Sequence, residues 1–220
     1  MLRKETKVTH LQEFLSQCDK ILFWQHDAII STIGMVLTNP TALIMEWLPM
    51  GTLDKYLQTH ENKLRQVDLV EAAYHIARAL WYLEEQQCCH GSIRCHNIMV
   101  ASHTDNSFKV KLADPGVISY SDADIHWIPP ECYNDYSRAA SSTAADVYAF
   151  GTTLWEIFSY GAKPFSNLSP KEAKELYQKG SSLGSPPGCH KEIEKLIFEC
   201  WIVDQDSRKR PQTIVRDVNQ

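Results

Sequence analysis

Apolar residues near the start of the chain change from helical spacing to short continuous runs. Between residues 9 and 23 they recur at the three- and four-residue intervals of an amphipathic helix. Two strand-like runs follow, through 29–37 and 42–47, and the turn signal Asn39-Pro40 separates them. This part of the sequence therefore predicts one helix followed by two short strands.

The rest of the chain predicts a helical body that one β-hairpin interrupts. Asp68 followed by Glu71 resembles a capping pair and opens a long helix. Apolar runs at 98–101 and 108–113 read as two strands joined by the polar turn 102–107. The expected buried stripe of the long helix consists of Leu69, Ala72, Ala73, Ile76, Ala77, Leu80 and Leu83.

Three further helices are indicated after the hairpin. Residues 147–158 are so apolar on all sides that this helix should be the central core element. Ser169-Pro170 suits an N-cap and the first turn of a second helix, and 193–201 carries another amphipathic stripe. The least regular stretches should be 65–69 and 180–188. No internal repeat is visible.

Composition indicates an ordinary globular domain and excludes several classes of protein. Hydrophobic residues make up 44% and charged residues 22%, and no low-complexity tract occurs. The formal net charge of −5 is spread evenly, which gives no reason to expect binding to nucleic acid or to an anionic membrane. Leu2 is followed directly by charged residues, and no apolar run approaches the roughly 18 residues of a membrane span. We therefore expect a cytoplasmic protein.

The seven cysteines do not suggest a disulfide framework. Their number is odd, Cys88 and Cys89 are adjacent, and no C-x-x-C pair occurs. We expect thiols buried in a reducing compartment rather than a zinc or redox site.

Four local motifs occur in a fixed order. His-Gly-Ser-Ile-Arg-Cys-His-Asn at 90–97 lies between the long helix and the hairpin, and Asp-Pro-Gly at 114–116 follows the second hairpin strand. Trp-Ile-Pro-Pro-Glu at 127–131 and Asp-Val-Tyr-Ala-Phe-Gly at 146–151 come next. This order resembles the catalytic loop, the D-F-G and A-P-E segments and the following helix of a protein kinase.

Phosphoryl transfer requires metal ions on the phosphates and a carboxylate that takes the proton of the acceptor hydroxyl. Asn97 and Asp114 are the residue types, at the matching positions, that would bind magnesium through oxygen. The kinase pattern has His-Arg-Asp at the start of this loop, and its Asp is the catalytic base. This chain has His90, Gly91 and Ser92 at those positions. A serine hydroxyl is no base near neutral pH, so a contribution of about 10²–10⁴-fold to the rate is absent. We expect no functional catalytic residue at 90–92.

The phosphate-binding lysine is also missing. No G-x-G-x-x-G occurs in the 220 residues, and the segment before Thr9 is too short to hold the glycine-rich loop and the strand that bears the lysine. If the first helix is the one that carries the glutamate partner of that lysine, the partner position is Gln17, which cannot form the ion pair.

Narrower details resemble the tyrosine-kinase branch and, within it, the pseudokinase domain of the Janus kinases. His-Gly-Ser at 90–92 combined with Asp-Pro-Gly at 114–116 is the most specific resemblance. It implies a cytoplasmic signalling protein bound to cytokine receptors, in which this domain restrains or licenses an adjacent tyrosine-kinase domain. The supporting matches are Trp127, the run 154–161, Ile128 to Cys132, Cys200-Trp201 and the segment 214–219.

The same resemblance implies a nucleotide site. Met45 would be the gatekeeper, Glu46 to Leu48 would form the hinge to adenine, and Met99 would lie under the ring. ATP and Mg²⁺ would bind weakly or not at all in this N-terminally truncated chain, which lacks the upper half of the cleft.

We therefore predict an α+β, protein-kinase-like fold with a mainly helical C-lobe, its β-hairpin and a partial N-lobe. Residues 1–48 would form the partial N-lobe and 49–220 the C-lobe. The leading function is regulation of a tyrosine kinase by a catalytically impaired domain. One alternative is a weakly active protein tyrosine kinase that works by metal and positioning alone. Another is a truncated gene product without a function of its own.

Several of these residues have structural interpretations. Glu131 and Arg210 should form a buried ion pair, and Asp146 should accept hydrogen bonds from the catalytic-loop backbone. His90 and His96 are six residues apart, and structural roles are favoured over metal binding because no further ligand cluster lies nearby. Two tyrosines, Tyr120 and Tyr133, are hypothetical phosphorylation sites.

Overall fold

A computed structural model describes residues 14–16, 18, 21–38, 41–113 and 116–219. The predicted first helix falls largely outside this part of the chain, although residues 14–16 are helical. Gln17 and Asp114 also lie outside the described residues, so the predictions made for them are not addressed by the structure.

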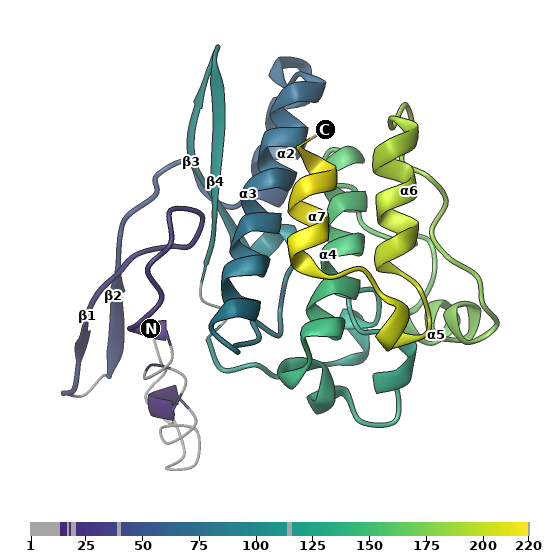
Figure 1. Ribbon diagram of the computed structural model, residues 1–220, viewed down its shortest axis with the longest axis horizontal. Helices are drawn as coiled ribbons and strands as arrows, with labels where there is room; N and C mark the ends of the chain where they lie inside the picture. Colours follow the sequence, from purple (N-terminus) through teal and green to yellow (C-terminus); the bar gives the residue numbers. More distant parts are fainter. Residues whose placement is uncertain (1–13, 17, 19–20, 39–40, 114–115, 220) are drawn as a thin grey trace.

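The two predicted strands near the N-terminus form a small separate sheet. β1 (Thr32–Val36) pairs antiparallel with β2 (Ala42–Met45), with an irregularity in register between Thr32 and Gly34. Figure 1 shows this sheet at one side of the molecule, with the second hairpin between it and the helices. The boundary at 48/49 between two lobes stays a prediction.

The first long helix begins earlier than the sequence suggested. After the short helix α2 (Leu53–His60), α3 runs over Gln66–Glu85 with Arg65 as its N-cap. Asp68 is the third residue of this helix, and its carboxylate accepts a hydrogen bond from the Arg65 backbone N–H at 2.7 Å. The predicted Asp68–Glu71 capping pair is therefore wrong, because Glu71 instead accepts the backbone N–H of Phe108 at 2.5 Å. Residues 66–69 are helical rather than irregular, and Arg65 is the extended residue that caps the helix.

The core forms around α3 and α4 (Thr143–Phe158). All seven residues of the predicted α3 stripe are buried, and thirteen of the sixteen residues of α4 are buried, which confirms α4 as the central element. α6 (Lys191–Cys200) approaches α4 closely at Gly151, where an added Cβ would lie 2.7 Å from the Cys200 Cβ. α7 (Pro211–Val218) packs on α3.

The second hairpin is longer than predicted. β3 (Ile98–Thr104) pairs antiparallel with β4 (Ser107–Leu112), which leaves only Asp105 and Asn106 in the turn. The polar run 102–107 reflects partial exposure of the strand ends rather than a loop, since Ser102 pairs with Lys109 and the ladder continues to Thr104–Ser107.

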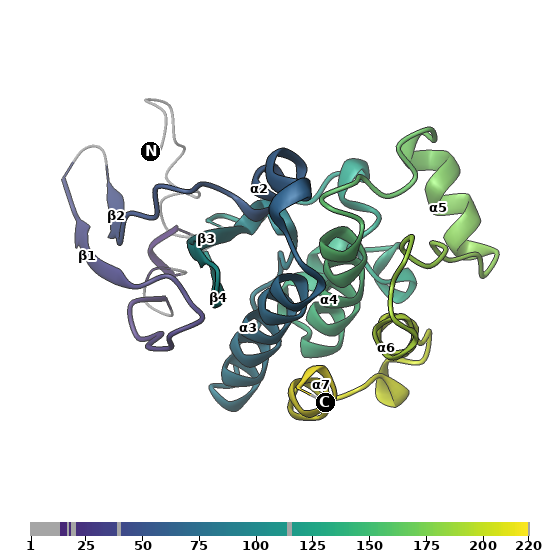
Figure 2. The same cartoon turned by 90° about the horizontal axis from the view of Figure 1, so that it is seen from above.

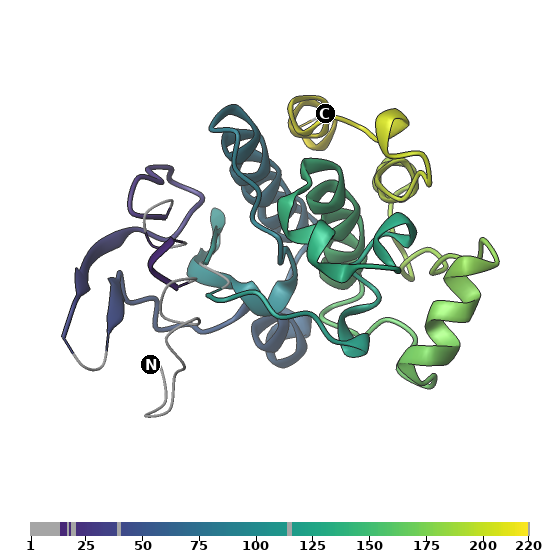
Figure 3. The ribbon, with the colours of Figure 1, turned by 90° about the horizontal axis from the view of Figure 1, so that it is seen from below.

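α5 (Pro170–Gln178) begins as predicted, with Ser169 as N-cap and its hydroxyl accepting the Glu172 backbone N–H. Figures 2 and 3 show α5 and the β1–β2 sheet at opposite ends of the molecule, with α3 and α4 between them. No helix in the described part of the chain is both long and apolar enough for a bilayer span. The cysteines lie outside any disulfide, as expected, but only part of the expected burial is found: Cys95, Cys132 and Cys200 are buried, whereas Cys88, Cys89 and Cys189 are half-buried.

Candidate functional site

The loop 90–97 connects α3 to β3, and α4 holds its first residues. The Asp146 carboxylate accepts the backbone N–H groups of His90 at 2.7 Å and Gly91 at 2.8 Å, which confirms the predicted role of Asp146. Burial raises the pKa of Asp146 to about 7, although the two hydrogen bonds favour the ionised form. Hydrogen bonds to Asp146 of the buried helix α4 therefore hold the first two residues of the loop in place.

The other end of the loop rests on the second half of α4. Glu156 accepts the Cys95 backbone N–H at 3.2 Å and the Trp127 indole N–H at 3.1 Å. The Thr153 hydroxyl donates to the Ile93 carbonyl at 3.1 Å. Burial raises the pKa of Glu156 to about 7 as well. Sequence reasoning did not assign these roles; an acidic residue and a threonine within so apolar a helix were the available signal.

His90 is a structural imidazole. The side chain is 1% exposed, its Nδ1 accepts the Ser92 backbone N–H at 3.2 Å, and its Nε2 therefore carries the proton and donates to the Ala113 carbonyl at 2.8 Å. Burial lowers the pKa of His90 to about 4, so the ring is neutral at pH 7. His96 instead faces Asp54 at 3.3 Å. The described residues contain no group of three or more His, Cys, Asp or Glu side chains that could hold a metal ion.

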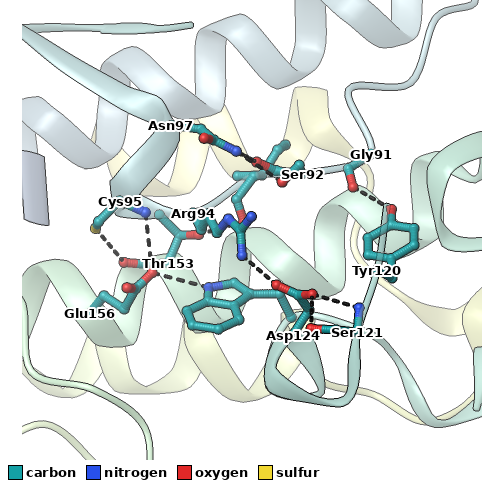
Figure 4. A network of polar contacts seen from close by, with 12 residues as sticks. Gly91, Ser92, Arg94, Cys95, Asn97, Tyr120, Ser121, Asp124, Thr153 and Glu156 are labelled. Atoms are coloured by element: carbon teal, nitrogen blue, oxygen red, sulfur yellow. Dashed lines mark hydrogen bonds and ion pairs between the residues drawn. The ribbon is translucent and has the colours of Figure 1, made fainter. Parts of the chain in front are cut away.

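Ser92 and Asn97 contact each other directly, as Figure 4 shows. The Asn97 side-chain amide donates to the Ser92 carbonyl at 2.8 Å and to the Ser92 hydroxyl at 2.9 Å. These bonds use the side-chain NH2 group, so the side-chain oxygen Oδ1 of Asn97 is the atom that could bind a magnesium ion. The second predicted ligand, Asp114, lies outside the described residues, so the pair itself stays a prediction.

The predicted hinge follows β2, at the edge of the small sheet. Met45 is the last residue of β2, and Leu48 is buried at 9% exposure. The Glu46 backbone N–H donates to the Ser31 carbonyl at 3.0 Å. These positions are compatible with a hinge, and their contact with adenine stays a prediction.

An ion pair joins the predicted hinge to the second hairpin. The Glu46 carboxylate accepts the Lys111 ammonium at 2.6 Å, and Lys111 pairs across the ladder with Met99. Burial raises the pKa of Glu46, but hydrogen bonds from Lys111 and the Ser31 backbone outweigh burial and bring it below its usual value. Met99, predicted to lie under adenine, is half-buried and forms a bridge with Thr52.

Residues after the Asp-Pro-Gly motif lie against the loop 90–97. The Arg94 guanidinium donates to the Asp124 carboxylate at 2.5 Å and lies 5.8 Å from the centre of the Trp127 ring. The Tyr120 hydroxyl donates to the Gly91 carbonyl (Figure 4). A hollow of about 540 Å³ lies beside these contacts, and its lining includes Asp54, Arg94, His96, Asp124, Trp127 and Glu156.

The predicted ion pair of Glu131 with Arg210 is wrong, because Arg208 is the partner. Arg208 Nη2 lies 2.8 Å from the Glu131 carboxylate, and the Arg208 side chain is 1% exposed. The short helical turn Gln205–Ser207 directs Arg208 inward, whereas Arg210 is exposed at the N-cap of α7. Arg208, the arginine nearer to Cys200 in the sequence, is therefore the buried partner of Glu131.

The two hypothetical phosphorylation sites are not exposed tyrosines. Tyr133 is 7% exposed and its hydroxyl oxygen is buried, so a kinase cannot reach it in this conformation. Tyr120 is partly buried, with its hydroxyl engaged by the catalytic loop.

Comparison with protein families adds independent evidence. The sequence model of the family described as "protein tyrosine and serine/threonine kinase" matches residues 1–218 of the 220-residue chain. The match includes the loop 90–97, the hairpin and the central helix, and the observed mixture of helices and small antiparallel sheets is compatible with that fold. Its description covers enzymes specific for tyrosine and for serine or threonine alike. The chain belongs to the protein tyrosine and serine/threonine kinase family.

Proposed function

We propose that this chain is a pseudokinase domain that acts by binding and regulates a tyrosine kinase in signalling of the cytokine-receptor type. The observation that carries the proposal is Ser92, which stands at the position of the catalytic base and whose hydroxyl accepts a hydrogen bond from Asn97. The sequence resemblance to the Janus-kinase pseudokinase domain supplies the class of partner and the cytoplasmic setting.

The chemistry at this position supports impaired catalysis. Phosphoryl transfer to a hydroxyl requires an acceptor for the proton near the attacking oxygen. A carboxylate serves at neutral pH, whereas an alcohol such as Ser92 does not, and a general base contributes about 10²–10⁴-fold. His90 offers no replacement, because it is buried with both ring nitrogens engaged.

Nucleotide binding without efficient turnover is part of the proposal. Adenine would lie between the segment 45–48 and Met99, and Asn97 with Asp114 would hold Mg²⁺, which neutralises phosphate charge when it is bound. The side-chain oxygen of Asn97 suits such an ion, and hydrogen bonds to Ser92 orient the Asn97 side chain. In a regulatory domain, bound nucleotide would stabilise the fold by mass action.

A second candidate function is that of a weakly active protein tyrosine kinase. The retained Asn97 favours it, because metal binding and positioning account for much of the rate in phosphoryl transfer. Such an enzyme would depend strictly on its metal ligands.

Phosphate incorporation tests the two functions against each other. The purified chain and its Asp114→Asn variant are incubated with labelled ATP, Mg²⁺ and a tyrosine-containing peptide. We expect no incorporation in either protein. Incorporation that disappears in the variant would overturn the pseudokinase proposal and establish the enzyme.

Regulation needs a separate measurement. The activity of a Janus-type tyrosine-kinase domain is measured with and without a molar excess of this chain. A change in the rate that depends on the concentration of the chain supports the regulatory role, and a rate that stays unchanged at every concentration contradicts it.

A further inference from the structure

A groove between two helices, here called the α3–α7 groove, is separate from the hollow beside the loop 90–97. α7 packs alongside α3 and runs in the opposite direction, as Figure 1 shows. The groove has a volume of about 480 Å³, within the range of ligand-binding pockets, and none of its lining residues lines the hollow. The lining consists of Tyr74, Trp81, Gln212, Thr213, Val215, Arg216 and Asn219.

Two aromatic side chains of α3 provide most of the apolar surface of the groove. Tyr74 and Trp81 are seven residues apart, so they lie on the same face of the helix and about 10 Å apart along its axis. Both are half-buried. Among the described residues, no hydrogen-bond partner contacts the Tyr74 hydroxyl or the Trp81 indole N–H, so both groups can bind a ligand.

Charge at the groove favours an acidic ligand. Arg216 is the one lining residue that is charged at pH 7, and 70% of its side chain is exposed. Its guanidinium lies 3.7 Å from the Asp217 carboxylate, which also pairs with Lys209, so Arg216 can still bind a second carboxylate. In a chain of net charge −5, the groove therefore presents a cation, and no carboxylate is among its lining residues.

The spacing of the two aromatic rings matches one turn of a polyproline II helix. Prolines at positions i and i+3 of such a helix lie on the same side, about 9 Å apart, and the two rings are about 10 Å apart. A polyproline II backbone has no internal hydrogen bonds, so its carbonyl groups can accept the Tyr74 hydroxyl and the Trp81 N–H. A helical peptide would use most of these carbonyl groups itself.

We propose that the α3–α7 groove is a docking site for an acidic Pro-x-x-Pro segment of a partner protein. Trp81 and Tyr74 contact the two prolines, as in other aromatic-lined grooves that bind such segments, and Arg216 pairs with a carboxylate beside them. The inference does not depend on the proposed regulation of a tyrosine kinase. A direct binding measurement therefore tests the groove alone.

Fluorescence anisotropy with a defined peptide tests the proposal. The probe is a fluorescein-labelled Glu-Pro-Ala-Ala-Pro-Glu peptide, whose two glutamates present a carboxylate in either direction of binding. Two control peptides replace both glutamates by glutamine or both prolines by alanine. We expect saturable binding to the purified chain and at least about fivefold weaker binding of each control peptide. No saturation up to about 1 mM, or equal affinity for the alanine peptide, would overturn the proposal.

Charge reversal places the peptide in the groove. Arg216→Glu is compared with Arg138→Glu, which makes the same change at an exposed arginine in the turn Tyr136–Ser141. We expect Arg216→Glu to weaken binding of the acidic peptide at least about tenfold, because hydrogen bonds between charged groups are worth factors of this size. Arg138→Glu should bind as the wild type does. Equal affinities of the two variants would contradict the role of Arg216.

The aromatic contact has its own pair of variants. Trp81→Ala should also weaken binding at least about tenfold, whereas Trp47→Ala, at a tryptophan that is 84% exposed outside the groove, should not. If Trp81→Ala does not fold, Arg216→Glu still decides, since it changes an exposed side chain. Sedimentation of the chain alone tests another occupant. Self-association that Arg216→Glu abolishes would assign the groove to a second copy and overturn the proposal.

Discussion

Replacing Arg208 by alanine removes a cation from the interior of the helical body. The guanidinium pairs with Glu131 at 2.8 Å and lies 5.4 Å from the centre of the Tyr148 ring. It also donates to three backbone carbonyls at 2.8 to 3.2 Å, those of Ala144, Ile202 and Val203. The side chain therefore connects the turn at Glu131, the start of α4 and the segment after α6.

The expected cost follows from what the substitution leaves behind. Removing one partner of a buried ion pair typically costs about 3–5 kcal/mol, because the other charge stays buried without compensation. Glu131 is partly exposed, with 23% of its side chain accessible, so water can reach it and the lower half of that range applies. The orphaned carbonyls add to the cost. We expect a loss of about 4 kcal/mol, which corresponds to a Tm lower by about 10 °C for a chain of this size.

Arg210→Ala is the matched control, because it removes the same group two residues away. Arg210 is exposed, and surface substitutions of this kind usually change stability by less than about 0.5 kcal/mol. Urea unfolding followed by circular dichroism gives the free energy of unfolding of both variants with a common m value. Equal losses, or a larger loss for Arg210→Ala, would refute the assignment of Arg208 as the partner of Glu131.

Three other tests, each with one or two substitutions, address the fold. Burial lowers the pKa of His126 to about 4, so its neutral form is favoured in the folded state and its own contribution to stability rises with pH between about 4 and 6.5; the difference in free energy of unfolding between the wild type and His126→Asn should therefore grow by about 1 kcal/mol per pH unit over this range in urea unfolding, and a constant difference would contradict the assignment. Gly151→Ala should cost about 1–3 kcal/mol by overpacking against Cys200, whereas Gly184→Ala, with open space around the added Cβ, should be nearly neutral in thermal melts; similar melts would argue against the close α4–α6 approach. Ser169→Ala should cost about 1 kcal/mol through loss of the α5 cap, and Ser169→Asp should restore it; a neutral Ser169→Ala would show that the cap is dispensable.

The sequence was sufficient wherever a feature depends on local periodicity. The α3 stripe, the apolar α4 and the Ser169 cap were predicted because each is determined by neighbours within one or two turns. The role of Asp146 was predicted for another reason, from its place in the order of the kinase motifs.

Features that depend on distant contacts were not predictable. Glu71 was taken for a capping residue, although its partner is the backbone of Phe108 on the hairpin. Arg208 and Arg210 are the same residue type two positions apart, so the sequence does not distinguish them. The turn at 205–207 precedes Arg208, which is the one that points inward. The contact of Tyr120 with Gly91 joins residues 29 positions apart, and no spacing rule indicates it.

The way in which α4 holds the catalytic loop has a consequence for how such a domain can evolve. Asp146 and Glu156 are ten residues apart on one straight helix, about 15 Å, and together with Thr153 they bind the loop. Their side chains bind main-chain N–H and C=O groups of residues 90–95, and one loop side chain adds to these contacts, because the Cys95 thiol donates to the Thr153 carbonyl at 3.9 Å. Main-chain groups are the same whatever the residue type. Side chains of the loop that take no part in its anchoring can therefore change while the path of the loop is preserved.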